Sequence, residues 1–159
     1  MPTLRPLIPS DRPWLCQWMT DHWGAEWRMV YGEQLYPAEH AGLAACEVEK
    51  AIGLVTYLIR SDECEILTLD SLIEGRGIGS GLVESVRNVA RQSGVCRLWL
   101  VTTNDNLNLL RFYQKRGFQP VKIHRRAVDE SRKIKPSIRI GSFGIPIRDE
   151  IELEMLLDN

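Results

Sequence analysis

The chain has 159 residues, of which 44% are hydrophobic and 26% charged, and this size and composition predict one globular domain over residues 1–159. No apolar run reaches the ~18 residues of a membrane span, and the opening "MPTLRPLIPSDRP" lacks the apolar core of a signal peptide. The four cysteines are scattered and form no CxxC pair. We therefore expect a cytoplasmic protein with no membrane partner, no bound metal and no disulfide framework.

The net charge of −1 conceals an uneven distribution. Residues 1–70 carry 5 Lys/Arg and 11 Asp/Glu, whereas residues 71–140 carry 14 and 5. A basic middle suits a polyanionic ligand and an acidic first part suits a cationic one, although ordinary solvated faces explain the same numbers. A nucleic-acid-binding protein is one reading of the basic residues, but no RNA- or DNA-binding motif accompanies them, so nucleic acid is not an expected partner.

The first elements are a short strand, "TLRPL", and a helix, "PSDRPWLCQWMTDHW". Ser10 or Asp11 opens the helix, and Pro13 falls in its first turn, where proline is tolerated. Trp14 and Trp18 are four residues apart and share one helix face, which predicts core packing. We treat the tryptophan-rich stretch as a helical region that continues towards Tyr31.

Three strand-like runs follow at roughly 42–48, 51–59 and 63–70, and their short polar links predict an antiparallel meander. Helical spacing then runs from Ser80 to a stop at Gly94. The strand "CRLWLVTT", the helix "NDNLNLLRFYQKRGF" and the strands "FQPVKIHRRAV" and "EIELEMLL" complete the pattern, with "DESRKIKPSIRIGSFGIPIRD" as a polar loop. This order predicts an α/β (α+β) fold: a single mixed, mostly antiparallel sheet of six to seven strands with about four helices packed on it.

A glycine cluster joins the third strand of the meander to the next helix, in "LTLDSLIEGRGIGSGLVESV". Gly75, Gly77 and Gly79 alternate there, with Arg76 between two of them. A glycine-rich turn at the start of a helix leaves backbone N–H groups pointing outward at the positive end of the helix dipole, which favours an anion. The spacing matches neither GxxxxGK[ST] nor GxGxxG, so a P-loop and a Rossmann turn are both excluded.

Residues 67–79 resemble motif A of the GNAT superfamily of acyl-CoA-dependent N-acetyltransferases, whose loop reads Gln/Arg-x-x-Gly-x-Gly/Ala. A second stretch resembles the family pattern Asn-x-x-Ala-x-x-x-Tyr-x-x-x-Gly-Phe, with Asn106, Tyr113, Gly117 and Phe118 in place. Glu74 departs from the first motif, and we expect its backbone to face the ligand while Arg76 offsets its charge. The resemblance implies the GNAT fold, with acetyl-CoA as the co-substrate.

The resemblance also implies how the coenzyme binds. The pyrophosphate lies on the amides of residues 75–80, and the pantetheine arm pairs with the backbone around Leu67 to Leu69. Asn106 contacts this arm or caps its helix, and Arg111, Lys115 and Arg116 are candidates for the 3′-phosphate. The implied cofactor-binding residues are Leu67, Leu69, Glu74, Gly75, Arg76, Gly77, Ile78, Gly79, Ser80, Asn106 and Arg111.

Tyr113 matches the general acid of the family. An unperturbed phenol has a pKa of about 10, so it is protonated at neutral pH and can give its proton to the departing sulfur. A core tyrosine packed beside Phe112 is the other reading. Glu65, followed by Glu63, is the candidate base, because alternate positions place both on the side of Leu67 and Leu69. A solvated strand face explains these two glutamates equally well.

The acceptor side is less defined. In the family the early helices overhang the acceptor site, so Trp23, Glu26, Trp27 and Tyr31 are its candidate residues. Glu26, the acidic residue of this group, suits a cationic amine. Segment 129–148 is the other candidate wall, and its basic residues suit a carboxylate-bearing acceptor instead; they are Arg132, Lys133, Lys135, Arg139 and Arg148.

Together these features predict an N-acetyltransferase that transfers the acetyl group of acetyl-CoA to a primary amine of a small molecule or peptide by direct attack. The alternative is a catalytically silent acyl-CoA-binding regulatory module. A homodimer formed through the last strand is a further possibility.

Overall fold

The computed structural model describes residues 2–134 and 141–158. They form two compact units: unit 1 holds the described residues of Met1–Trp27, Tyr36–Leu98 and Leu156–Asn159, and unit 2 holds Arg28–Leu35 and those of Trp99–Met155. Over these residues the chain forms a mixed sheet of seven strands, a separate two-stranded hairpin and four α-helices. This architecture confirms the predicted fold class. None of the described helices is long and apolar enough to cross a membrane.

Unit 1 is built on four antiparallel strands in the order β1-β4-β5-β6. The predicted meander is confirmed, because β4, β5 and β6 follow one another along the chain and pair as neighbours. Strand β5 carries a nearly continuous buried run, as expected for a strand with both faces covered. The bounds are Thr3–Pro6 for β1, Ala41–Glu47 for β4, Lys50–Arg60 for β5 and Glu63–Ser71 for β6.

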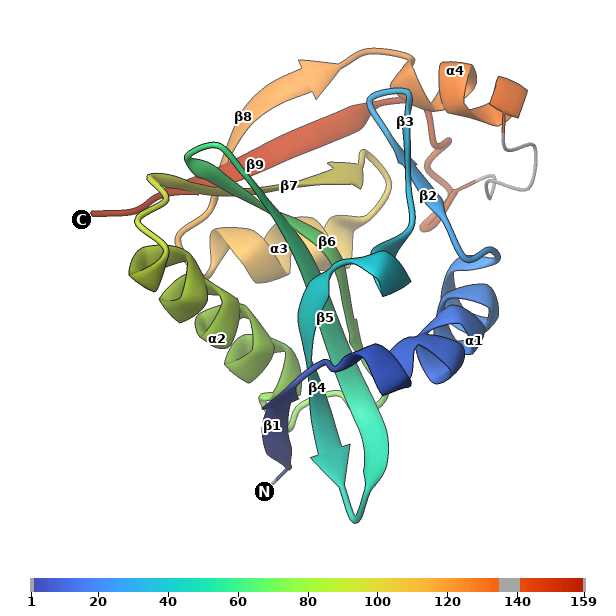
Figure 1. Cartoon of the computed structure of the whole chain (residues 1–159). Helices are drawn as coiled ribbons and strands as arrows, with labels where there is room; N and C mark the ends of the chain where they lie inside the picture. Colours follow the sequence, from blue (N-terminus) through green and yellow to red (C-terminus); the bar gives the residue numbers. More distant parts are fainter. Residues whose placement is uncertain (1, 135–140, 159) are drawn as a thin grey trace. The chain divides into compact units, whose positions relative to one another are not determined.

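Helices α1 (Arg12–Trp23) and α2 (Ile78–Gln92) cover opposite faces of these strands (Figure 1). Two consecutive residues of β5 show how side chains alternate between the two faces of the sheet. A Cβ on Gly53 would lie 2.7 Å from Ile78 Cγ2 of α2, whereas Leu54 packs with Trp18 of α1. Two short 3-10 helices, Pro9–Asp11 and Pro37–Glu39, lie beside α1.

Unit 2 contains the hairpin and the second half of the chain. Strands β8 and β9 pair antiparallel, with an irregularity between Pro120 and Lys122. The bounds are Arg28–Val30 for β2, Glu33–Leu35 for β3, Arg97–Thr103 for β7 (whose first two residues belong to unit 1), Leu107–Gln114 for α3, Gln119–His124 for β8, Ala127–Ile134 for α4 and Glu150–Leu156 for β9 (whose last residue belongs to unit 1).

Segment 129–148 is not simply a loop, because its first part continues helix α4. The helix was missed because it has only eight residues and most of them are polar. Acidic residues fill its first turn and basic residues its last, an arrangement that the helix dipole favours. Of the basic residues expected there, Arg132 donates to the carbonyl of Ile147. Lys135 and Arg139 lie outside the described residues.

The predicted helix ends at Trp23 as expected, but the helical region does not continue towards Tyr31. Helix α1 stops at Trp23, and Gly24 follows as its C-cap with φ 80°. The β2–β3 hairpin comes next, and its turn contains Tyr31 (φ 49°) and Gly32 (φ 77°). Turns with two positive φ values join tight hairpins, but a bulky side chain at the first such position is unusual. Tyr31 is therefore a turn residue and not a helical one.

Candidate active site

The glycine loop of unit 1 leads from β6 into α2. Gly75 and Gly77 have φ of 76° and 73°, the left-handed region that favours glycine. A Cβ at either position would meet nothing within 4 Å, so the backbone conformation, and not crowding, calls for glycine there. Gly77 is the N-cap of α2 and no side chain caps the helix. The helix begins at Ile78, earlier than the predicted Ser80, so the last two motif residues lie in its first turn.

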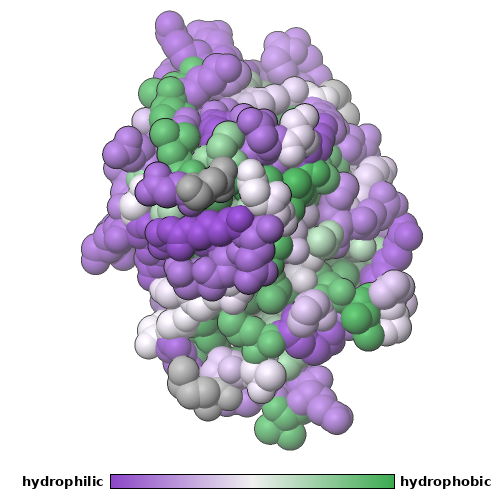
Figure 2. Space-filling view, turned by 60° about the vertical axis from the view of Figure 1, so that its left-hand side comes forward, coloured by the Kyte–Doolittle hydropathy of each residue, from purple (hydrophilic) through white to green (hydrophobic). Residues whose placement is uncertain are grey.

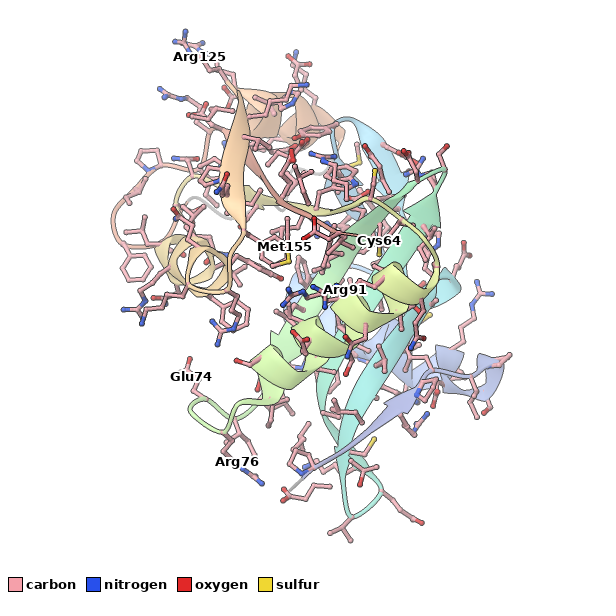
Figure 3. All side chains as sticks on the ribbon, turned by 90° about the vertical axis from the view of Figure 1, so that its left-hand side faces the viewer. Cys64, Glu74, Arg76, Arg91, Arg125 and Met155 are labelled. Atoms are coloured by element: carbon pink, nitrogen blue, oxygen red, sulfur yellow. The ribbon has the colours of Figure 1, made fainter. Side chains whose placement is uncertain are left out.

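The two charged side chains of the loop point in opposite directions (Figure 3). Arg76 pairs with Glu47 of β4, with its two nitrogens 3.0 and 3.2 Å from the two carboxylate oxygens, and not with Glu74. This pairing lowers the pKa of Glu47 and raises that of Arg76. Glu47 stands at the base of the β4–β5 turn, whose tip projects at the lower end of Figure 2 and whose Val48 is 95% exposed.

Strand β6 contains a bulge that changes which side chains share a face. Thr56 of β5 pairs with Thr68, but the next residue, Tyr57, pairs with Ile66, so Leu67 is an extra residue on β6. Because residues that pair across antiparallel strands lie on one face, the alternation reverses at the bulge. The prediction that the two glutamates share the side of Leu67 and Leu69 is therefore wrong.

Glu63 and Glu65 instead share a face with Thr68 and Asp70, the face that α1 covers. Glu65 is 4% exposed, and burial, together with the charge of Glu65, raises the pKa of the neighbouring Cys64 thiol to about 12. Glu63 lies closer to solvent and forms an ion pair with Arg97 at 3.4 Å. Of the two candidate bases, Glu65 is therefore the buried one.

In unit 2, helix α3 carries the residues of the second motif. Asn106 is its N-cap and its side-chain oxygen accepts from the Leu109 amide at 3.3 Å, which confirms the capping alternative. Tyr113 is 2% exposed, and its ring lies edge-on to those of Phe112 and Phe118, each at 5.1 Å. Gly117 (φ 95°) turns the chain back so that the amide of Phe118 reaches the carbonyl of Tyr113 at 3.1 Å.

The three basic candidates for the 3′-phosphate follow one another along and after α3. Arg111 and Lys115 are exposed. Arg116 lies over the Phe112 ring at 3.6 Å and donates to the Phe112 carbonyl at 2.8 Å. Arg111 and Lys115 are thus more accessible than Arg116 to a ligand in solution.

The model of the acetyltransferase (GNAT) family matches residues 10–118 of the chain. The chain belongs to the GNAT acetyltransferase family. It is 39% identical to the uncharacterized protein YdhI of Bacillus subtilis (strain 168) over 157 residues, which cover 96% of this chain and 98% of YdhI. The match includes both motifs, so their positions in the fold are those of a GNAT domain.

Solved structures of GNAT-fold proteins show the same architecture. A Bacillus subtilis acetyltransferase in complex with CoA superposes with a TM-score of 0.72 and 18% identity, covering 99% of both chains. A GNAT family acetyltransferase from Elizabethkingia anophelis with acetyl-CoA bound has a TM-score of 0.69 and 22% identity, covering 98% of both chains. At these identities the likeness concerns the fold.

One carboxylate that the motif comparison did not single out anchors α1. Asp70, near the end of β6, accepts the indole N–H groups of Trp18 (3.0 Å) and Trp23 (2.8 Å) on the same oxygen. Trp18 is 8% exposed and lies edge-on to Trp14 with ring centroids 6.0 Å apart, so the predicted core packing of Trp18 is confirmed. No local sequence pattern signals this anchor, because Asp70 stands 52 residues after Trp18.

A second cluster outside the motifs surrounds Tyr31 in unit 2. Its hydroxyl donates to Glu152 at 2.8 Å, and its ring lies 3.9 Å from that of His124 and is stacked on Trp99 at 6.4 Å. Glu150 and Glu152 are only 5% and 9% exposed, and burial raises the pKa of the former. The pattern "EIELE" predicted a strand correctly, but burial of its acidic face was not foreseen.

The expected acceptor residues therefore fall into both units. In unit 1, Trp23 and Trp27 are half-buried and Glu26 is exposed, and the indole of Trp23 is hydrogen-bonded to Asp70 of the strand that carries Glu65. In unit 2, Tyr31 is half-buried within its own cluster. Among the described residues no group of three or more His, Cys, Asp or Glu side chains could hold a metal ion.

Proposed function

We propose that this protein is an N-acetyltransferase that transfers the acetyl group of acetyl-CoA to a primary amine by direct attack. The observation that carries the proposal is the glycine loop: two glycines with positive φ deliver the chain into α2, and no side chain caps that helix. An anion at such a helix start interacts favourably with the backbone N–H groups and with the helix dipole. The pyrophosphate of CoA is the anion that the family uses.

In this proposal β6, the loop and the first turn of α2 hold the coenzyme. The backbone of Leu67 and Leu69 pairs with the pantetheine arm, and residues 74–80 surround the pyrophosphate. Asn106, although it caps α3, is close in sequence to the acid, and Arg111 is an exposed cation available to the 3′-phosphate.

Two side chains carry the proton transfers that the reaction needs. The attacking amine must lose a proton, and the buried carboxylate of Glu65 on the α1-covered face of β6 serves as its base, directly or through water. The departing thiolate must gain a proton, and the phenol of Tyr113 supplies it. Glu63, which is paired with Arg97, is the second choice of base.

Thiol release from acetyl-CoA tests the proposal, with polyamines, amino sugars, amino acids and peptides as acceptors. Tyr113→Phe should lower kcat by about 10- to 1,000-fold, because a general acid is lost, while CoA affinity is kept. Phe118→Tyr is a control that changes a neighbouring ring without removing the acid. Full activity of Tyr113→Phe would contradict the acid assignment, and CoA binding without thiol release for any amine would favour the regulatory module.

A further inference from the structure

A single oxygen of Asp70 receives both indole N–H groups from the second half of α1. Trp18 and Trp23 reach this oxygen from positions five residues apart, at 3.0 and 2.8 Å. Hydrogen bonds to an ionised acceptor are shorter and stronger than those between neutral groups. The carboxylate therefore fixes the helix end at two points.

The two tryptophans depend on this carboxylate to different degrees. Trp18 is also buried in the apolar cluster with Leu15 and Leu54, so packing holds it as well. Trp23 is half-buried, is the last residue of α1, and precedes Gly24, where the chain turns with φ 80°. The bond to Asp70 thus fixes the point from which the chain leaves the helix towards Glu26 and Trp27.

On its other side Asp70 leads directly into the glycine loop. The amide of Leu72 donates to the carbonyl of Ile52 at 2.9 Å, and the hydroxyl of Ser71 donates to the carbonyl of Ile73 at 2.9 Å. Asp70 is thus hydrogen-bonded to α1 on one side and lies only a few residues before Gly75 on the other. Asp70 therefore links the end of α1 to the start of the glycine loop.

We propose that Asp70 is a positioning residue for the acceptor: it fixes the end of α1, and with it Trp23, Glu26 and Trp27, relative to the strand that carries the coenzyme. This inference rests on the proposed function. Asp70 acts through the indoles and does not contact the reacting atoms. Its loss should therefore raise KM for the acceptor and leave the affinity for CoA unchanged.

Kinetics of two variants test this role, with the first amine that gives thiol release as the acceptor. Asp70→Ala should raise acceptor KM by about 10- to 100-fold, since small misplacements of binding groups have effects of this size. Asp70→Asn keeps an amide oxygen that can accept the indole N–H groups, so it should restore most of the loss. An unchanged acceptor KM in Asp70→Ala, or an equal loss in both variants, would overturn the proposal.

A measurement that needs no acceptor tests the anchor itself. In protein labelled with 5-fluorotryptophan, Asp70→Ala should shift the fluorine resonances of Trp18 and Trp23 more than that of Trp14, whose indole donates to Asp11 at 2.8 Å. Trp18→Phe and Trp23→Phe assign the signals, and Asp11→Ala is the matched control that should move Trp14 most. An unmoved Trp23 resonance in Asp70→Ala would overturn the anchor.

Calorimetric titration of the wild-type protein with CoA separates this inference from the proposed function. No binding would end the proposed function and, with it, the acceptor role of Asp70, whereas the fluorine spectra decide the anchor by themselves. Binding and acetyl transfer with no effect of Asp70→Ala on acceptor KM would leave the proposed function standing and remove the positioning role. Trp23→Phe, which loses one N–H and spares the apolar cluster, should show a smaller rise in acceptor KM.

Discussion

The glycine loop and helix α1 both border strand β6, but they are fixed in different ways. The loop is shaped by its backbone: its glycines adopt positive φ, and its one ion pair given above, Arg76 with Glu47, lies at the surface. Helix α1 is fixed by side chains, since Trp14 donates to Asp11 and Trp18 and Trp23 donate to Asp70. The comparison predicts that the loop, the proposed coenzyme side, tolerates side-chain changes that α1, the proposed acceptor side, does not.

The largest effect should come from the carboxylate at the start of α1. Asp11 accepts two bonds from Arg5, one from the Ile8 amide and one from the Trp14 indole, all at 2.8 to 2.9 Å. Asp11→Asn leaves these partly buried donors without an ionised acceptor, which should lower the free energy of unfolding by about 2 kcal/mol at pH 7 in urea titrations. Gln17→Ala, which removes only an exposed bond to Asp21, is the control and should have little effect.

The same variant carries a pH signature. The bonds from Arg5 hold the pKa of Asp11 well below its usual range, so the stabilisation is present above the ordinary aspartate pKa of about 4 and is lost as pH falls below it. The difference between wild type and Asp11→Asn should therefore shrink when unfolding is measured at progressively lower pH. If the difference in free energy of unfolding between the two proteins stayed constant down to the acid transition, the stabilising role of the Asp11 carboxylate would be contradicted.

A change in the loop backbone should have a smaller effect on stability but a clear effect on the coenzyme. Gly77→Ala places a Cβ at φ 73°, which costs about 1 to 2 kcal/mol, and should weaken CoA binding by about tenfold in calorimetry. Gly81→Ala is the matched control in α2, since its Cβ would make only an ordinary 3.6 Å contact with Leu4 Cδ1. Equal CoA affinity of the Gly77→Ala and Gly81→Ala variants would mean that the loop conformation does not determine CoA binding.

The same division between backbone-shaped and side-chain-bonded regions separates what the sequence predicts from what it does not. The glycine loop and α3 were located because spacing encodes backbone geometry locally: Gly77 is the N-cap of α2, and Gly117 turns the chain just after α3 ends at Gln114. The Tyr31–Glu152 bond joins residues 121 positions apart, and no local pattern signals it. Helix α4 was missed because it is mostly polar. The facing of the β6 glutamates was wrong because a bulge leaves no mark in the alternation of one strand.

The smallest effect should come from the surface ion pair of the loop. Glu47→Gln releases Arg76 and removes a negative charge near the proposed pyrophosphate site. CoA binding should therefore tighten, but by less than about threefold, because solvent weakens the interactions of exposed charges. The gain should fade in high salt, as expected for exposed charges. Weaker CoA binding in this variant would mean that Glu47 holds Arg76 in a conformation that the coenzyme needs.

The extra residue in β6 also decides on which side of the strand its glutamates lie. If Leu67 were deleted and the ladder closed without it, Glu63 and Glu65 would stay on the side of Thr68 and Asp70, because Ile66 and Thr68 already pair with consecutive residues of β5. If Leu67 were instead paired as a regular strand residue, both glutamates would move to the opposite side from Asp70, although none of them had been mutated. The register of β6 therefore has to be aligned and engineered as two half-strands, one on either side of position 67.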